Sequence, residues 1–129
     1  MSVLNVAIAG FGTIGSGVAH VLAKHSENID AKINLAGILE RDTKGQFARS
    51  WFEKKPELFY KSPEILLEST DIDVIVETIG GSEFALELIS KALQNGKHVV
   101  TANKDLIAVH GAELIEVARE NGCHLLFEA

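Results

Sequence analysis

A short glycine-rich turn restricts the fold of this 129-residue chain more than any other feature. It has the sequence Gly10-Phe11-Gly12-Thr13-Ile14-Gly15 and directly follows an apolar run at residues 3–9. Residues 13–24 then repeat apolar side chains at helical spacing. A continuous apolar run predicts a strand that is buried on both faces of a parallel sheet. The beginning of the chain therefore predicts a strand, a tight turn and an amphipathic helix.

Segments of strand character and of helical spacing alternate along the rest of the chain. We expect further strands at residues 33–39, 58–60, 74–78, 98–101 and 124–127, and helices at residues 62–69, 83–95 and 110–120. Residues 26–30 are expected to form a loop. At residues 42–55 a helix is uncertain, although Phe47, Trp51 and Phe52 would share one of its faces.

This alternation predicts parallel strands joined by right-handed crossovers. We expect an α/β fold with a doubly wound sheet of Rossmann type, in the strand order 3-2-1-4-5-6. A length of 129 residues suits one domain, so residues 1–129 are interpreted as a single domain.

Composition excludes several classes of protein. With 18 acidic and 12 basic side chains the net charge is −6, which disfavours a nucleic-acid-binding surface because such surfaces are basic. No apolar run approaches the ~20 residues that span a membrane, and no basic signal-peptide segment precedes the first strand. We therefore predict a cytoplasmic protein. The single cysteine, Cys123, is interpreted as a buried, reduced thiol without a catalytic role.

The glycine turn has the spacing of a dinucleotide-binding site. Gly10 permits a tight strand-to-helix turn, Gly12 leaves room for a pyrophosphate, and Gly15 lets the helix approach the sheet. Free N–H groups on Thr13 and Ile14 would then point toward the phosphates. The alternative is a closely packed turn without a ligand. The strand before the turn and the helix after it favour the dinucleotide site.

The second strand ends in Glu40-Arg41-Asp42, which bears on the choice of cofactor. An acid at this position binds the ribose hydroxyls of NAD, whereas an arginine accepts the 2′-phosphate of NADP. A guanidinium can bind a phosphate through two nitrogens. We favour NADP, bound through Arg41, with NAD also accepted. An exposed charged turn is the alternative.

Residues after the later strands should face the same cofactor, because ligands bind at the carboxyl ends of the strands. Thr78 and the two glycines that follow can pass close to it. Lys104 could exchange a proton with an alcohol, stabilise an alkoxide or anchor a substrate carboxylate. A surface lysine is the alternative, but a helix start disfavours a cation, which favours function. Glu128 alone indicates only a surface acid, and the five histidines lack metal-ligand spacing.

Several motifs resemble homoserine dehydrogenases. Residues 76–81 (VETIGG) and 96–104 (GKHVVTANK) are similar to segments of that family, and the similarity continues at residues 110–114 and 127–129. The nine-residue segment is specific, whereas many dehydrogenases share the glycine turn. The resemblance implies an NAD(P)-dependent oxidoreductase that interconverts L-homoserine and L-aspartate 4-semialdehyde, in the biosynthesis of threonine, methionine and isoleucine.

The resemblance also implies roles for single residues. Phe11, Thr13 and Ile14 would lie in the phosphate loop, and Arg41 would meet the adenosine 2′-phosphate. Thr78 would line the cofactor site. The catalytic lysine, where cofactor and substrate meet, would be Lys104. A ligand of a structural sodium ion would be Glu128.

The resembling enzymes continue into a dimerisation and substrate domain with the homoserine-binding acids, the other sodium ligands and a second catalytic lysine. We expect residues 1–129 to end before that domain, to bind cofactor without catalysing, and to leave the sodium site empty. The full-length protein is expected to be a homodimer. Two alternatives stay open: another amino-acid dehydrogenase, such as an aspartate dehydrogenase, and a nucleotide-sensing module without chemistry. The TANK segment argues against the first.

Overall fold

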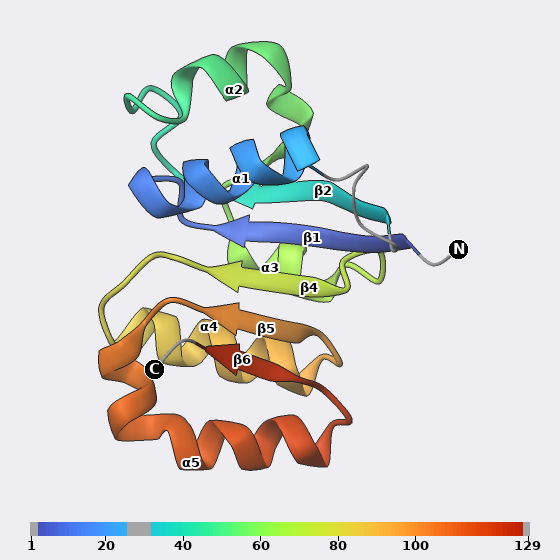
Figure 1. The fold of residues 1–129 in the computed structure, drawn as a ribbon, viewed down its shortest axis with the longest axis vertical. Helices are drawn as coiled ribbons and strands as arrows, with labels where there is room; N and C mark the ends of the chain where they lie inside the picture. Colours follow the sequence, from blue (N-terminus) through green and yellow to red (C-terminus); the bar gives the residue numbers. More distant parts are fainter. Residues whose placement is uncertain (1–2, 26–31, 128–129) are drawn as a thin grey trace.

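The chain folds around one sheet in which the strands follow the order β3-β2-β1-β4-β5-β6. Every neighbouring pair of strands is parallel. The computed structural model describes residues 3–25 and 32–127. Helices lie on both faces of the sheet (Figure 1). The expected α/β, doubly wound architecture and its strand order are therefore confirmed.

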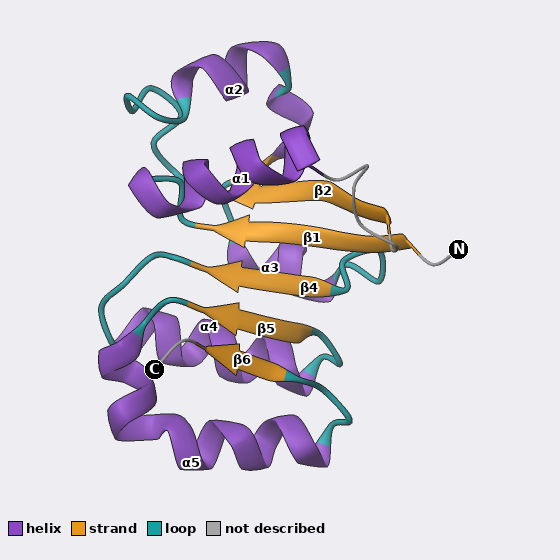
Figure 2. Ribbon diagram, in the orientation of Figure 1, coloured by secondary structure: helices purple, strands orange, loops and turns teal. Residues whose placement is uncertain are grey.

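Strands and helices alternate along the chain (Figure 2). The strands are β1 (Val3–Ala9), β2 (Lys32–Leu39), β3 (Phe59–Tyr60), β4 (Val74–Glu77), β5 (His98–Thr101) and β6 (Leu125–Phe127). The helices are α1 (Thr13–His25), α2 (Arg49–Lys54), α3 (Pro63–Glu68), α4 (Glu83–Gln94) and α5 (Lys104–Glu120), with a short 3-10 helix, η2, at Pro56–Leu58. Within the described ranges, 3–25 and 32–127, no helix has the length and apolar character needed to cross a membrane.

Helix α5 begins at Lys104, so the predicted start at His110 was wrong. The Oδ1 atom of Asn103 accepts a hydrogen bond from the N–H of Leu106 at 3.1 Å, which caps the helix. Leu106 is buried, so the first turn of α5 is also part of the core. Residues 103–105 are polar, so the apolar spacing that predicts a helix does not mark this start in the sequence.

Only α2 forms an α-helix within residues 42–55, between β2 and β3, so the helix is shorter than this segment allowed. Trp51 and Phe52 are half-buried, as an inward face requires, but Phe47 is exposed. Strand β3 is shorter than predicted because Leu58 ends η2. Strand β4 ends one residue early, which leaves Thr78 in the following turn. The predicted loop at residues 26–30 lies outside the described residues.

Apolar side chains form a core on each face of the sheet. Helices α3, α4 and α5 supply one core, which includes the fully buried Leu88. Helices α1 and α2 enclose a smaller core around Ile38. Strand β1 contributes Ala7 to the first core and Ile8 to the second. Burial on both faces explains its continuous apolar sequence.

Helix α1 approaches the end of β1 more closely than a side chain would allow. A Cβ atom on Gly15 would lie 2.1 Å from the carbonyl oxygen of Gly10 and 2.9 Å from Oγ1 of Thr78. Gly10 itself has a φ of +91°, a conformation that favours glycine. The expected tight turn and the expected close helix packing are both confirmed.

A buried lysine lies where the strands begin, at the edge of the sheet opposite the glycine turn. Lys97 directly precedes β5, and its Nζ donates hydrogen bonds to the carbonyl oxygens of Ser69 and, at 3.0 Å, of Ile72. Burial lowers the pKa of the Lys97 ammonium, and the nearby Asp73 carboxylate opposes that shift. Lys97 therefore ties β5 to the loop that precedes β4.

Cys123 lies near the same edge, just before β6. Its thiol is free, as expected, but it is half-buried rather than buried. The Sγ atom lies 3.6 Å from the carbonyl oxygen of Leu93. Burial raises the pKa of the Cys123 thiol.

The two glycines in α1 provide a matched test of the helix contact. We expect Gly15→Ala to lower the free energy of unfolding by about 3 kcal/mol or more, because the new methyl group meets backbone atoms. Gly17→Ala should instead raise it by up to about 1 kcal/mol, since nothing lies within 4 Å of that position. Urea unfolding of both variants measures the difference, and equal stabilities would contradict the close approach.

Alkylation tests the environment of Cys123, the only cysteine in the chain. A raised pKa leaves less thiolate at pH 8, and the thiolate is the reactive form. Iodoacetamide should therefore modify the folded chain several-fold more slowly than the urea-unfolded chain, with the rates followed by mass spectrometry. Equal rates would show that the thiol is neither shielded nor shifted.

Candidate functional site

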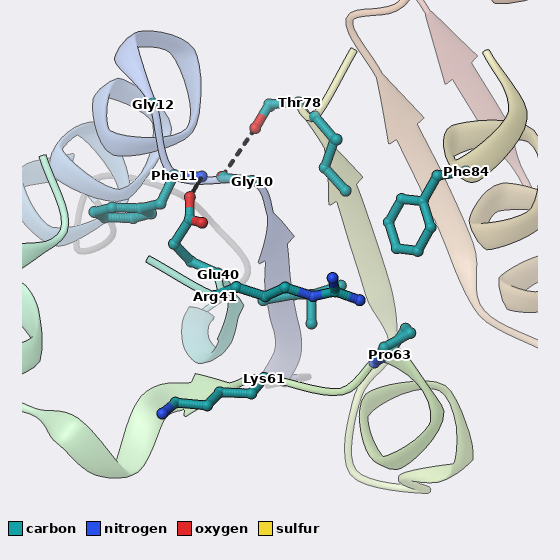
Figure 3. Close-up of a pocket in the computed structure, with 11 residues that line it drawn as sticks. Gly10, Phe11, Gly12, Glu40, Arg41, Lys61, Pro63, Thr78 and Phe84 are labelled. Atoms are coloured by element: carbon teal, nitrogen blue, oxygen red, sulfur yellow. Dashed lines mark hydrogen bonds between the residues drawn. The ribbon is translucent and has the colours of Figure 1, made fainter. Parts of the chain in front are cut away.

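Two cavities border the carboxyl ends of the strands. The first has a volume of about 560 Å³ and is lined by Gly10, Phe11, Gly12, Leu39, Glu40, Arg41, Lys61, Pro63, Thr78, Ile79 and Phe84 (Figure 3). The second has a volume of about 360 Å³ and is lined by Ile14, Glu77, Thr78, Gly80, Gly81, Ala102, Asn103, Lys104 and Asp105. Thr78 lines both, so the cavities are neighbours.

The glycine turn forms one wall of the first cavity. The hydroxyl of Thr78, just after β4, is shared between the carbonyl oxygens of Ala9 and Gly10, each at 3.0 Å, and so holds the glycine turn beside the end of β4. Figure 3 shows the bond to Gly10. A Cβ atom on Gly12 would meet nothing within 4 Å, so open space lies beside this residue. Helix α1 starts at Thr13, where its free N–H groups and its dipole favour an anion.

Phe11 takes part in the turn through its backbone rather than its side chain. The ring is only 3% exposed and packs edge-on against Trp51, with centroids 5.8 Å apart, and against Phe59 at 6.1 Å. Its N–H donates to Oε1 of Glu40 at 3.0 Å. The aromatic contacts therefore anchor the turn to α2 and β3.

Glu40 and Arg41 both line the first cavity, but they differ in how they are held. The Glu40 carboxylate accepts hydrogen bonds from the N–H groups of Phe11, at 3.0 Å, and Asp42, at 3.2 Å. Arg41 is exposed, and its side chain extends across the cavity toward Pro63 and Phe84 (Figure 3). A fixed carboxylate and a guanidinium free to reorient thus share one site.

Lys61 is a second cation of this cavity that the sequence analysis missed. It directly follows β3, and this position after a predicted edge strand was the available signal. Lys61 and Arg41 also line an adjoining cavity of about 280 Å³ together with Glu64 and Lys91. The Ser62 hydroxyl, which donates to the Glu64 carboxylate at 2.5 Å, is the main cause of a lowered pKa at Glu64. Two cations, Arg41 and Lys61, therefore line the first cavity, and the acid Glu64 lies in the adjoining one.

Lys104 lies in the second cavity, at the carboxyl edge where the sequence analysis placed it. It is exposed and is the first residue of α5. The preceding Asn103 joins two turns, since its Nδ2 donates to the carbonyl oxygen of Gly81 at 2.6 Å. Ile14, on the first turn of α1, lines the same cavity. Lys104 therefore lines a cavity that the glycine turn also borders.

A buried acid behind the second cavity is the other residue that the sequence analysis did not single out. Glu77 is fully buried at the end of β4. Its carboxylate accepts hydrogen bonds from Thr101 and from the turn at Ile79 and Gly80. Its place in the segment VETIGG was the only sequence signal.

Glu128, the predicted sodium ligand, lies outside the described residues. Within the described part of the chain, no group of three His, Cys, Asp or Glu side chains could hold a metal ion. The sodium site stays a prediction from the resemblance.

The two cavities suit the parts of a dinucleotide. Volumes of about 560 and 360 Å³ are in the range of small-molecule sites. The open space beside Gly12 and the start of α1 can accept phosphates between the cavities. Arg41 and Lys61 line the first cavity and Lys104 lines the second, so each cavity has a cationic side chain.

Known proteins share both the sequence and this fold. Residues 10–128 match a family model described as the NAD binding domain of homoserine dehydrogenase. The chain is 35% identical to homoserine dehydrogenase of Bacillus subtilis and 41% identical to that of Pseudomonas aeruginosa. Each alignment covers 100% of this chain and 30% of the relative. The chain thus spans about 30% of the length of these relatives.

Solved structures agree with these relatives. Staphylococcus aureus homoserine dehydrogenase superimposes with a TM-score of 0.87 and 37% identity, over 100% of this chain and 33% of the other. A hyperthermophilic archaeal homoserine dehydrogenase in complex with NADPH gives a TM-score of 0.77 and 28% identity, over 98% and 44%. The chain therefore belongs to the family of homoserine dehydrogenase NAD-binding domains.

Proposed function

We propose that the chain is the cofactor-binding part of an NAD(P)-dependent oxidoreductase that interconverts L-homoserine and L-aspartate 4-semialdehyde. The observation that carries the proposal is the pairing of two adjacent cavities. The glycine turn borders both of them, and Lys104 lies in the second. The enzyme would serve the biosynthesis of threonine, methionine and isoleucine.

The proposed cofactor lies across both cavities. Its adenosine end would lie in the first cavity, with the pyrophosphate beside Gly12 and the N–H groups of Thr13 and Ile14. Its nicotinamide end would reach the second cavity, where it supplies hydride transfer to or from the substrate carbon. Lys104 would exchange a proton with the substrate oxygen, or stabilise negative charge on it.

The charged groups of the first cavity support NADP as the preferred form. Arg41 is free to bind a 2′-phosphate through two nitrogens, and Lys61 can add a second positive charge. The Glu40 carboxylate, held by Phe11 and Asp42, can still accept a hydrogen bond from a ribose hydroxyl of NAD. Both cofactors would therefore bind, NADP more tightly.

Three further features belong to the same proposal. The full-length protein would form a homodimer in the cytoplasm. Glu128 would contribute to a sodium site together with residues of the full-length protein.

Variants of the two cations test the cofactor preference. Arg41→Ala should weaken NADPH binding by about tenfold or more, because a charge-assisted contact is lost, and should change NADH binding little. Lys61→Ala should act in the same direction with a smaller factor. Trp51, the only tryptophan, contacts Phe11 and provides the fluorescence signal for these titrations.

Two controls complete these titrations. Gly12→Ala should weaken both cofactors alike, because its methyl group enters the space proposed for the pyrophosphate. Lys24→Ala removes an exposed lysine from the distal end of α1 and should change neither affinity. Equal losses of NADPH and NADH in Arg41→Ala would contradict the assignment of the 2′-phosphate.

Activity of the isolated residues 1–129 is a separate test. We expect this chain to bind NADPH but not to reduce NADP with homoserine, because the substrate-binding acids and the second lysine of the resembling enzymes belong to a further domain. The absorbance of NADPH measures turnover, with the B. subtilis enzyme as a positive control. Turnover by the isolated chain would refute this division of roles.

A further inference from the structure

The buried carboxylate of Glu77 takes no part in the chemistry proposed above. The side chain is 0% exposed and lies on the same face of β4 as Ile75, because every second residue of a strand points to the same side. An apolar side chain could fill this position, as Ile75 fills its own. Burial of an acid costs free energy unless its oxygens are hydrogen-bonded. The presence of Glu77 is therefore to be explained by the groups that it binds.

Both oxygens of Glu77 accept hydrogen bonds, one from the turn after β4 and the other from Thr101, the last residue of β5. Oε2 accepts from the N–H groups of Ile79, at 2.9 Å, and Gly80, at 3.1 Å. Oε1 accepts from the hydroxyl of Thr101 at 2.5 Å. The oxygen of Thr101 accepts the N–H of Asn103 at 3.0 Å, so its hydrogen is directed to Glu77. In all three hydrogen bonds the Glu77 side chain is the acceptor, so both of its oxygens are satisfied despite their burial.

Asn103 closes these contacts into a ring. Its Nδ2 donates to the carbonyl oxygen of Gly81 at 2.6 Å, and its Oδ1 caps α5 by accepting the N–H of Leu106. Gly80 and Gly81 have φ values of +82° and +76°, a conformation that favours glycine, and the hydrogen bonds of Glu77 and Asn103 reach this turn from both sides. The ring links the turn after β4 to the turn after β5.

We propose that Glu77 is a positioning residue that holds the two walls of the second cavity, and Lys104 between them, at the separation that the nicotinamide end of the cofactor requires. The inference rests on the proposed function. Lys104 directly follows Asn103 at the capped start of α5, so the ring fixes its main chain. Glu77 is fully buried, and its hydrogen bonds run to the turn after β4 and to Thr101 at the end of β5, so it acts through these segments.

Two substitutions of Thr101 separate this role from simple support of the fold. Thr101→Val keeps the shape of the side chain without the hydroxyl, and Thr101→Ser keeps the hydroxyl. The probes are NADPH, which would reach both cavities, and adenosine 2′,5′-bisphosphate, which would reach only the first.

The ratio of the two dissociation constants is the readout. We expect Thr101→Val to weaken NADPH binding by about tenfold and to change bisphosphate binding by less than about twofold, since one hydrogen bond of the ring is lost. Thr101→Ser should retain most of the NADPH affinity. Glu77→Gln should raise the dissociation constant of NADPH relative to that of the bisphosphate, as Thr101→Val does. If Thr101→Val does not fold, Glu77→Gln replaces it as the test of the inference.

Lys97→Met is the matched control. It also removes a buried polar group, but at the start of β5, whereas Thr101 lies at the end of that strand. There Lys97 donates hydrogen bonds to the carbonyl oxygens of Ser69 and Ile72. We expect it to lower the melting temperature without changing the ratio of the two affinities. The melting temperatures of all variants show which of them are folded at the titration temperature.

The possible outcomes differ clearly. The inference would be overturned by any one of three results. Thr101→Val could weaken both ligands equally, or Thr101→Val and Thr101→Ser could bind NADPH alike. The third result is a wild-type chain that binds NADPH no more tightly than the bisphosphate. In these cases the cofactor assignment itself would stand. A wild-type chain that binds neither ligand would overturn the proposed function, and the inference with it.

Discussion

The first turn of α1 rests on the carbonyl group of Gly10, and the geometry of both cavities follows from that contact. No Cβ atom fits at Gly15, so the helix start lies as close to the sheet as the backbone permits. Thr78, in the turn after β4, hydrogen-bonds to the same carbonyl group and lines both cavities. The helix start therefore lies between the two cavities, where its N–H groups can serve a phosphate.

Buried polar groups are placed at the two edges of the sheet, with apolar cores between them. At the starting edge, Lys97 ties β5 to a loop through two carbonyl groups. At the carboxyl edge, Glu77 accepts hydrogen bonds from the turn after β4 and from Thr101 at the end of β5. Hydrogen bonds compensate the burial of each group, and each compensation also fixes a loop.

Local charge, rather than net charge, governs the first cavity. The chain as a whole carries a charge of −6, yet two cations, Arg41 and Lys61, line this cavity. The nearby acid, Glu40, is occupied by two backbone N–H groups, which hold it beside the glycine turn. An acidic protein can therefore present a cationic end to a phosphate while keeping an acceptor for a ribose hydroxyl.

Sequence patterns alone were enough to predict the strand order, the glycine turn, and the placement of Arg41, Thr78 and Lys104 at the carboxyl edge. These features follow from local periodicity and from the parallel geometry of alternating strands and helices. The start of α5 and the positions of Lys61 and Glu77 became visible only in the folded chain.

The reason is that these features depend on contacts between residues that are distant in sequence. Thr101 meets Glu77 across 24 positions, and the backbone of Phe11 meets Glu40 across 29. A buried acid and an exposed acid look alike in a linear pattern. Only tertiary packing decides which of them is surrounded by donors, and so which of them can hold the walls of a site.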